Sequence, residues 1–139
     1  MKVCEYVPHG AVPDVRGFAP AVVAQNFAKF LKEDTYVISA AEGYEKCHEN
    51  SEYGDLWREG HGKLYNKIFN KITNLDPYPL YAMAAKIVRQ NQVEIFHAHQ
   101  LEFPVAEFRK MVAPNTKIVA HAHVTRRFDP KWGKADAYI

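Results

Sequence analysis

The 139-residue sequence has only two cysteines, little net charge and no long apolar run. No stretch approaches the roughly 20 apolar residues that a membrane-spanning helix needs, and the opening MKVCEYV is too short for the apolar region of a signal peptide. Cys4 and Cys47 have no metal-ligand spacing and do not indicate the disulfide framework of a small secreted domain. We therefore expect a soluble protein in a reducing compartment, the cytoplasm.

The net charge of the chain gives no indication of nucleic-acid binding. Eighteen lysines and arginines against sixteen acidic residues give a net charge of +2, which is too small to indicate a nucleic-acid partner. The 47% of apolar residues is enough for one core of ordinary domain size. We expect a single domain over residues 1–139.

Short β-rich runs alternate with longer helical patterns along the chain. The patterns predict strands at 2–7, 35–40, 93–98, 117–124 and 135–139, and helices at 19–32, 63–75, 76–91 and 104–112. Residues 41–62 are polar and contain four glycines, and we interpret them as a long excursion at the sheet edge. Strands that alternate with helices predict an α/β fold, a doubly wound, Rossmann-like parallel sheet with right-handed crossovers.

Two of the predicted strands end in His-x-His, in the segments EIFHAHQ (94–100) and KIVAHAHV (117–124). Ligands of doubly wound sheets bind beyond the carboxyl ends of the strands, so both motifs are expected at one rim, together with the loop after the first strand. Residues two apart on a strand point to the same side. We expect His99 and His123 at the open edge, and His97 and His121 in the core, bonded to backbone.

Four segments in order resemble the amino-terminal half of the GT-B glycosyltransferases. They are VRGFAPAVVAQNFAKFL, EIFHAHQ, KIVAHAHV and the terminal ADAYI, and together they extend over nearly the whole chain. The resemblance is to the large retaining family (glycosyltransferase group 1, family 4-like) that includes sucrose synthase relatives and bacterial lipopolysaccharide and capsule enzymes. It implies the acceptor-binding half of an enzyme that moves a sugar from a nucleotide-sugar donor to a glycan or lipid-linked acceptor, in lipopolysaccharide or polysaccharide biosynthesis.

The resemblance also implies what this chain lacks. In the GT-B plan a second domain or subunit binds most of the nucleotide-sugar co-substrate, and the sequence ends before any such domain. We therefore expect the whole enzyme to be a glycosyltransferase and this chain alone to have little activity. GT-B enzymes commonly dispense with a metal, so the resemblance implies neither a metal nor a cofactor.

Carried over residue by residue, the resemblance assigns a glycine-rich loop to Arg16, Gly17 and Phe18. There the missing side chain lets backbone amides approach a sugar or a phosphate. The family usually has two or more adjacent glycines at this point, and this chain has one.

The two strand-end motifs supply the other candidate residues. His99 matches the second histidine of its strand motif, and Gln100 follows it where an acidic residue or asparagine is common. His123 matches the histidine that faces the acceptor and the transferred sugar, and we take it as the catalytic residue. Arg126 follows the second motif and is placed to bind a phosphate or acidic sugar in a bidentate manner.

Two other function classes remain open from the residues. Zinc needs three or four N, O or S ligands, which four histidines can supply, so a metal-dependent hydrolase is the main alternative. Acidic residues that would support such ligands are few near the motifs: Glu94, Glu102 and Asp129. A non-enzymatic binding module with a Rossmann-like fold is the third reading, because a fold does not fix a function.

The helix predicted at residues 63–75 is amphipathic and basic. Its apolar stripe consists of Leu64, Tyr65, Ile68, Phe69 and Ile72. Beside this stripe lie three lysines spaced four residues apart, Lys63, Lys67 and Lys71. We interpret the stripe as a face that covers the sheet, which is the usual role of such a helix. The alternative is a peripheral contact with anionic lipid at the inner face of the membrane, which would suit a lipid-linked acceptor.

Overall fold

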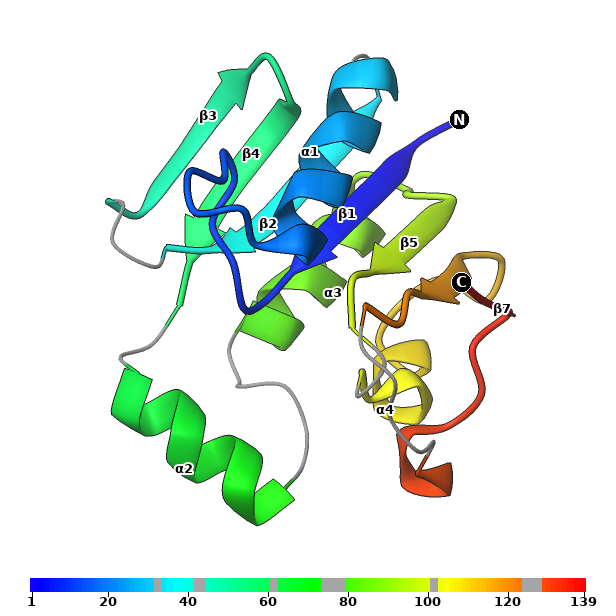
Figure 1. Cartoon of the computed structure of the whole chain (residues 1–139). Helices are drawn as coiled ribbons and strands as arrows, with labels where there is room; N and C mark the ends of the chain where they lie inside the picture. The colour runs from blue at the N-terminus through cyan, green and yellow to red at the C-terminus, as the bar shows by residue number, and fades with distance from the viewer. Residues whose placement is uncertain (32–33, 42–44, 61–62, 74–79, 101–102, 124–128) are drawn as a thin grey trace.

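The computed structural model of the chain describes residues 1–31, 34–41, 45–60, 63–73, 80–100, 103–123 and 129–139. Its centre is a seven-stranded sheet with helices on both faces (Figure 1). The strands are β1 (Val3–Val7), β2 (Thr35–Ala40), β3 (Cys47–Ser51), β4 (Gly54–Glu59), β5 (Ile95–Ala98), β6 (Lys117–Ala120) and β7 (Ala137–Tyr138). The helices are α1 (Ala19–Leu31), α2 (Lys63–Thr73), α3 (Leu80–Gln90), α4 (Val105–Arg109) and the 3-10 helix η1 (Pro130–Trp132).

The order of the strands confirms the predicted fold class. The sheet runs β3-β4-β2-β1-β5-β6-β7, and every neighbouring pair is parallel except β3 and β4. Numbered among themselves, the six mutually parallel strands follow the order 3-2-1-4-5-6 of Rossmann folds. The order reverses between β1 and β5, and loops that leave this switch point form the usual ligand crevice of the fold.

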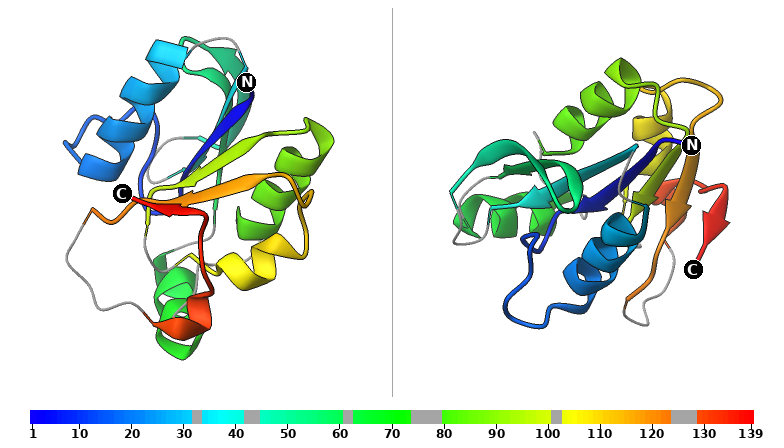
Figure 2. Two further views of the ribbon diagram at one scale, coloured as in Figure 1. Left: turned by 90° about the vertical axis from the view of Figure 1, so that its right-hand side faces the viewer. Right: turned by 90° about the horizontal axis from the view of Figure 1, so that it is seen from above.

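Each face of the sheet has its own hydrophobic core. On one face α3 and α4 cover an aromatic group that includes Tyr6, Phe96 and Phe108. On the other face α1 packs over β1, β2 and β4. Figure 2 shows α1 on one side of the sheet and α3 and α4 on the opposite side. The sheet is therefore buried on both faces at its centre, which is what its continuous apolar strands require.

Helix α1 forms where it was predicted, but a different face of it is buried. The residues that pack on the sheet are Ala21, Ala24 and Ala28, which lie at helical spacing. Phe27 and Phe30, which stood out in the apolar pattern, are 44% and 86% exposed. Alanines on the contact face allow the helix axis to lie close to the strands, so the larger side chains are left at the flanks.

Of the excursion predicted at 41–62, the structure describes residue 41 and residues 45–60, which lie at the sheet edge as predicted but contain two strands that were not predicted. β3 and β4 pair as an antiparallel hairpin, and β4 continues the sheet by pairing with β2. The sequence CHENS of β3 shows no alternation of apolar residues because an edge strand with exposed side chains has no core to face. Tertiary pairing, and not local pattern, makes these residues extended.

Helix α2 stands apart from the sheet, beyond the end of β4 (Figure 1). Its apolar residues Leu64, Ile68 and Ile72 are 71%, 50% and 77% exposed, so the interpretation that this stripe covers the sheet is wrong. Among the described residues no helix has both the length and the apolar character of a membrane span. The predicted end of this helix, at residue 75, and the predicted start of the next, at residue 76, lie outside the described residues. The inward residues predicted for α3 are buried, as expected: Leu80, Ala84, Ile87 and Val88.

We predict that Gly54→Ala destabilises the protein more than Gly17→Ala. Both glycines have positive φ, +88° and +75°, so alanine is strained at either position by about 1–2 kcal/mol. A Cβ at Gly54 would also overlap the carbonyl oxygen of Thr35 on β2, whereas one at Gly17 would meet nothing within 4 Å. The overlap adds about 1–3 kcal/mol. Urea denaturation of both variants measures the difference, and equal losses would contradict the close contact between β4 and β2.

Candidate functional site

Four histidines and one glutamate meet at the carboxyl edge of the sheet. Glu5 of β1 is in register with His97 of β5, and His99 follows the end of that strand. His121 and His123 follow the end of β6, which pairs with β5. Alternation along β1 places Glu5 on the face that α1 covers, because Tyr6 belongs to the opposite core. We call Glu5, His97, His99, His121 and His123 the histidine cluster.

The Glu5 carboxylate lies at the centre of the cluster. Its Oε2 atom is 3.0 Å from Nδ1 of His97 and 2.5 Å from Nε2 of His99. Each of these rings then contacts a further one. Nε2 of His97 lies 3.2 Å from Nδ1 of His121, and Nδ1 of His99 lies 3.1 Å from Nε2 of His123. The two outer rings stack at a centroid distance of 4.1 Å. One carboxylate therefore supports two branches of two imidazoles each.

Glu5 is ionised although it is 1% exposed. Burial raises the pKa of its carboxyl, but hydrogen bonds from His97 and His99 outweigh burial and hold the pKa below its ordinary value. A buried carboxylate without such donors would cost several kcal/mol. The two imidazole donors are therefore a condition for burying this residue in β1.

The same environment disfavours the charged form of three of the histidines, His99, His121 and His123. Burial lowers the pKa of His99, although the nearby Glu5 carboxylate opposes this change. Burial and then the neighbouring rings lower the pKa of His121, and they lower the pKa of His123 to about 4. Protonation of more than one ring is unfavourable because the like charges of neighbouring rings would repel each other.

With neutral rings, the carboxylate determines which nitrogen of each ring carries the proton. An ionised Glu5 only accepts, so His97 donates from Nδ1 and His99 from Nε2. The other nitrogen of each ring is then an acceptor, and His121 Nδ1 and His123 Nε2 must donate to them. This leaves Nε2 of His121 and Nδ1 of His123 as lone pairs. Both outer rings are half-exposed, so these lone pairs belong to the part of the cluster that a ligand can reach.

The structure brings together His99 and His123, the two histidines expected at the rim, but not at equal depth. The His99 side chain has no exposed surface, so it reaches a ligand only through His123. The expectation that His97 and His121 bond to backbone from within the core is wrong for their rings. They bond to each other, and His97 also bonds to Glu5. Ring pairing across two strands accounts for both His-x-His motifs.

The loop after β1 forms a turn that occupies its own amides. The backbone N–H groups of Gly17 and Phe18 donate to Oδ2 of Asp14, at 2.6 and 2.9 Å. In this conformation those two amides do not offer an anion site. Arg16, Gly17 and Phe18 are all exposed, and the φ of Gly17, not a close contact, explains the glycine.

The remaining candidate residues differ in how the structure places them. Gln100 follows His99 and is buried at 7% exposure. Arg126 lies outside the described residues. Among the acids considered as metal support, Glu94 lies before β5, at the amino edge, where its Oε1 accepts a hydrogen bond from the backbone N–H of Lys2. It is therefore remote from the histidine cluster.

The sequence-based search missed Glu5, the acid at the centre of the cluster. The signal was present, because an acidic residue interrupts the otherwise apolar run VCEYV of a central parallel strand. Charged residues are almost never fully buried unless they are paired. Glu5 therefore required a partner, and the histidines on the neighbouring strand were the available donors.

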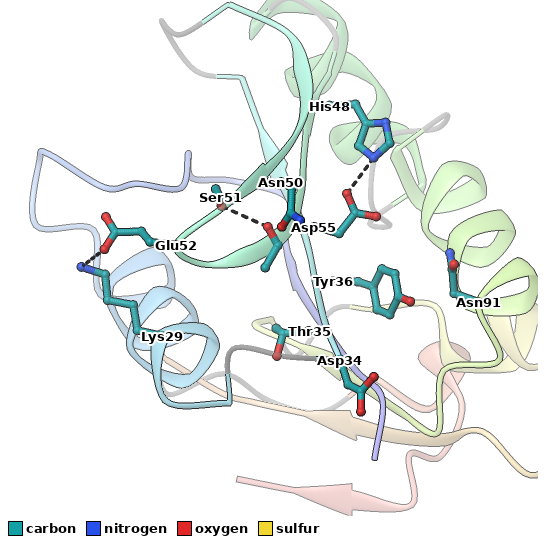
Figure 3. Close-up of a pocket in the computed structure, with 11 residues that line it drawn as sticks. Lys29, Asp34, Thr35, Tyr36, His48, Asn50, Ser51, Glu52, Asp55 and Asn91 are labelled. Carbon is teal, nitrogen blue, oxygen red and sulfur yellow. Dashed lines mark hydrogen bonds and ion pairs between the residues drawn. The ribbon is translucent and has the colours of Figure 1, made fainter.

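A cavity of about 1080 Å³ lies at the opposite edge of the sheet (Figure 3). It is lined by the β3–β4 turn, by Asp34 and Thr35 at the start of β2, and by Asn91 before β5. Polar side chains in its wall pair with one another, such as Lys29 with Glu52 at 3.0 Å. Pairing with Glu52 raises the pKa of Lys29 and lowers that of Glu52, but both side chains are exposed. The perturbed groups of the histidine cluster are buried or half-buried, so we favour the cluster as the functional site.

We predict that His123 makes stability depend on pH. In the unfolded chain residue 123 binds a proton near pH 6.5, whereas in the folded chain it does so near pH 4. As pH falls through this interval the unfolded state gains a proton that the folded state does not, so the free energy of unfolding decreases, and it is restored above pH 6.5. His123→Gln should make this dependence shallower. Urea denaturation from pH 7.5 to pH 4 measures it, with the exposed His9→Gln as control, and an unchanged slope in His123→Gln would contradict the prediction.

Comparison with known proteins finds no family model, no curated protein and no solved structure that matches the chain. Function must therefore be inferred from the Rossmann-like fold and from the contacts of the histidine cluster.

Proposed function

We propose that this chain is the acceptor-binding half of a glycosyltransferase with the GT-B plan. The enzyme would transfer a sugar from a nucleotide-sugar donor to a glycan or lipid-linked acceptor, and a second domain or subunit would hold the donor. One observation carries the proposal: His99 and His123 pair at 3.1 Å on the carboxyl edge, next to the β1–β5 switch point. This is the edge at which doubly wound folds bind their ligands.

His123 is the residue that meets the acceptor in this proposal. Its Nδ1 lone pair can accept a hydrogen bond from a sugar hydroxyl and orient the hydroxyl oxygen toward the donor carbon. Burial and the surrounding rings lower its pKa to about 4, well below the value near 7 that suits a general base at neutral pH. Its role is therefore to position the acceptor, with proton removal as a minor contribution.

Glu5 and His99 hold the His123 ring through a chain of hydrogen bonds on its buried side. A neutral His99 that donates to Glu5 must accept from His123, which fixes the ring orientation and the tautomer of His123. Fixed orientation matters because transfer requires the hydroxyl within about 3–3.5 Å of the reacting carbon. The loop of Arg16, Gly17 and Phe18 then contributes to acceptor binding through its exposed side chains, since its amides at 17 and 18 are bound to Asp14.

The proposal predicts that the chain binds glycans and that His123→Gln weakens this binding by about tenfold, the loss of one well-placed hydrogen bond. A glycan array would identify a ligand, and histidine-ring NMR would locate it at the cluster. His48→Gln on β3 is the matched control, because His48 is also an exposed histidine but pairs with Asp55 far from the cluster. Binding of UDP-glucose instead of glycans, or equal binding by both variants, would contradict the proposal.

We also propose that α2 contacts an anionic membrane surface, which suits a lipid-linked acceptor. Its apolar residues Leu64, Ile68 and Ile72 are exposed, and the exposed Lys67 and Lys71 flank them. An interfacial helix combines these two features, with apolar side chains among the acyl chains and lysines near the headgroups. The helix follows β4 after a short connection, so it lies beyond the carboxyl edge that bears the histidine cluster (Figure 1). An acceptor that stays in the membrane could then reach that edge.

We predict that Lys67→Glu/Lys71→Glu reduces binding to vesicles that contain phosphatidylserine by tenfold or more. Each lysine near an anionic surface contributes about 1 kcal/mol, and reversal of its charge adds repulsion. Co-sedimentation with phosphatidylcholine vesicles, with and without phosphatidylserine, measures the effect. Lys86→Glu/Lys117→Glu changes the net charge equally on exposed residues of α3 and β6 and should bind like the wild type. Equal losses in the two double variants would show that net charge, and not α2, determines binding.

A further inference from the structure

The histidine cluster also has the geometry of a metal site. Glu5 accepts from one nitrogen of His97 and one of His99, which leaves Nε2 of His97 and Nδ1 of His99 as lone pairs on the side away from the carboxylate. Histidines that bind metals almost always donate their other ring N–H to a carboxylate or carbonyl, which fixes the tautomer and increases the basicity of the ligating nitrogen. Glu5 does this for two rings at once.

The distances between rings suit a shared ion. Two ligands at about 2.0–2.1 Å from a tetrahedral zinc ion lie about 3.3 Å apart. The nitrogens of His97 and His121 lie 3.2 Å apart, and those of His99 and His123 lie 3.1 Å apart. One ring nitrogen from each of His97, His99 and His121 can be chosen so that all three lie within 4.8 Å of one another. Small ring rotations would bring these nitrogens to coordination distance.

We propose that His97, His99 and His121 bind one divalent transition-metal ion of the zinc class, with His123 as a fourth ligand and Glu5 as the carboxylate that orients two of the rings. Imidazole ligands suit zinc, copper and nickel ions better than calcium or magnesium ions. The ion takes the place of the protons on His121 Nδ1 and His123 Nε2, which move to the other nitrogen of each neutral ring, so binding changes the tautomer of these two rings.

Burial and charge agree with this assignment. His97 and His99 are 6% and 3% exposed, and the half-exposed His121 and His123 form the side from which an ion can enter. An ion with two positive charges would lie next to the buried Glu5 carboxylate, which carries one negative charge.

This inference does not rest on the proposed transfer function. Its test uses a metal ion alone and no sugar, so it can fail while glycan binding by His123 succeeds, and the reverse also holds. If both hold, metal and acceptor compete for His123, and zinc should weaken glycan binding in the wild type but not in His121→Ala.

The test is calorimetric titration of the full chain, made without a polyhistidine tag, with ZnCl₂. We expect one ion per chain in the wild type, and at least a tenfold loss of affinity in His121→Ala, a half-exposed position where folding should be kept. Glu5→Gln should lose about 10- to 100-fold, the effect of removing the carboxylate partner of a ligating histidine. His48→Ala, which removes an exposed histidine on β3, should bind like the wild type.

A second measurement keeps the test independent of folding defects. Long-range ¹H–¹⁵N NMR of the wild-type imidazoles should show zinc-dependent shifts of the coordinating nitrogens in His97, His99 and His121, and none in His48. Affinity should fall as pH decreases, because protons compete for the same nitrogens. Absence of a stoichiometric ion in the wild type, equal binding by His121→Ala and His48→Ala, or unchanged ring nitrogens at saturation would each overturn the proposal.

Discussion

A buried carboxylate in the central strand is the constraint on which the site depends. Glu5 has almost no exposed surface, so its charge has to be satisfied inside the protein. The donors come from β5, the neighbour of β1 at the point where strand order reverses. Parallel pairing places Glu5 opposite His97, and the period of two along β5 puts His99 on the same face. A shift of one residue between these strands would turn both rings to the aromatic core and leave the carboxylate unpaired, so the polar contact and the hydrophobic alternation favour the same register.

The ionised Glu5 also determines which hydrogen bonds the outer rings make. Once Glu5 fixes His97 and His99, each inner ring offers one acceptor nitrogen, and only a donor can satisfy it. β6 supplies these donors by repeating the same His-x-His pattern one strand further along the sheet. The repetition that is visible in the sequence therefore has a physical reason. Burial lowers the pKa of His99, His121 and His123, so protonation of these three rings is unfavourable beside the ionised Glu5.

The sequence predicted those parts of the fold that depend on local pattern. Strands β1 and β2, helices α1 and α3, and the convergence of both His-x-His motifs at one edge follow from periodicity and from the rules of parallel sheets. The hairpin β3–β4 was missed because its residues are extended through pairing with β2, a partner distant in sequence. The buried face of α1 was misjudged because Ala21 and Ala24 pack closely while the larger Phe30 faces solvent, a choice that depends on the distance between helix and sheet. In the site, the depth of each histidine could not be predicted without Glu5, since the carboxylate and not the strand end determines which ring lies inside.

The two proposals for the cluster differ in what lies between its rings. With protons between the inner and outer rings, the outer lone pairs face outward and can accept hydrogen bonds from hydroxyl groups, as a sugar acceptor requires. With a metal ion there, lone pairs of all the rings turn inward and the cluster becomes a closed centre. Closed coordination is the mark of structural metal sites, whereas catalytic sites keep one position open. A zinc ion held by all four histidines would therefore strengthen the junction of β5 and β6, and His123 would no longer be free to bind the proposed acceptor. Coordination by three histidines would instead leave His123 available to a ligand. Whether His123 binds the ion therefore decides between a structural and a functional metal centre.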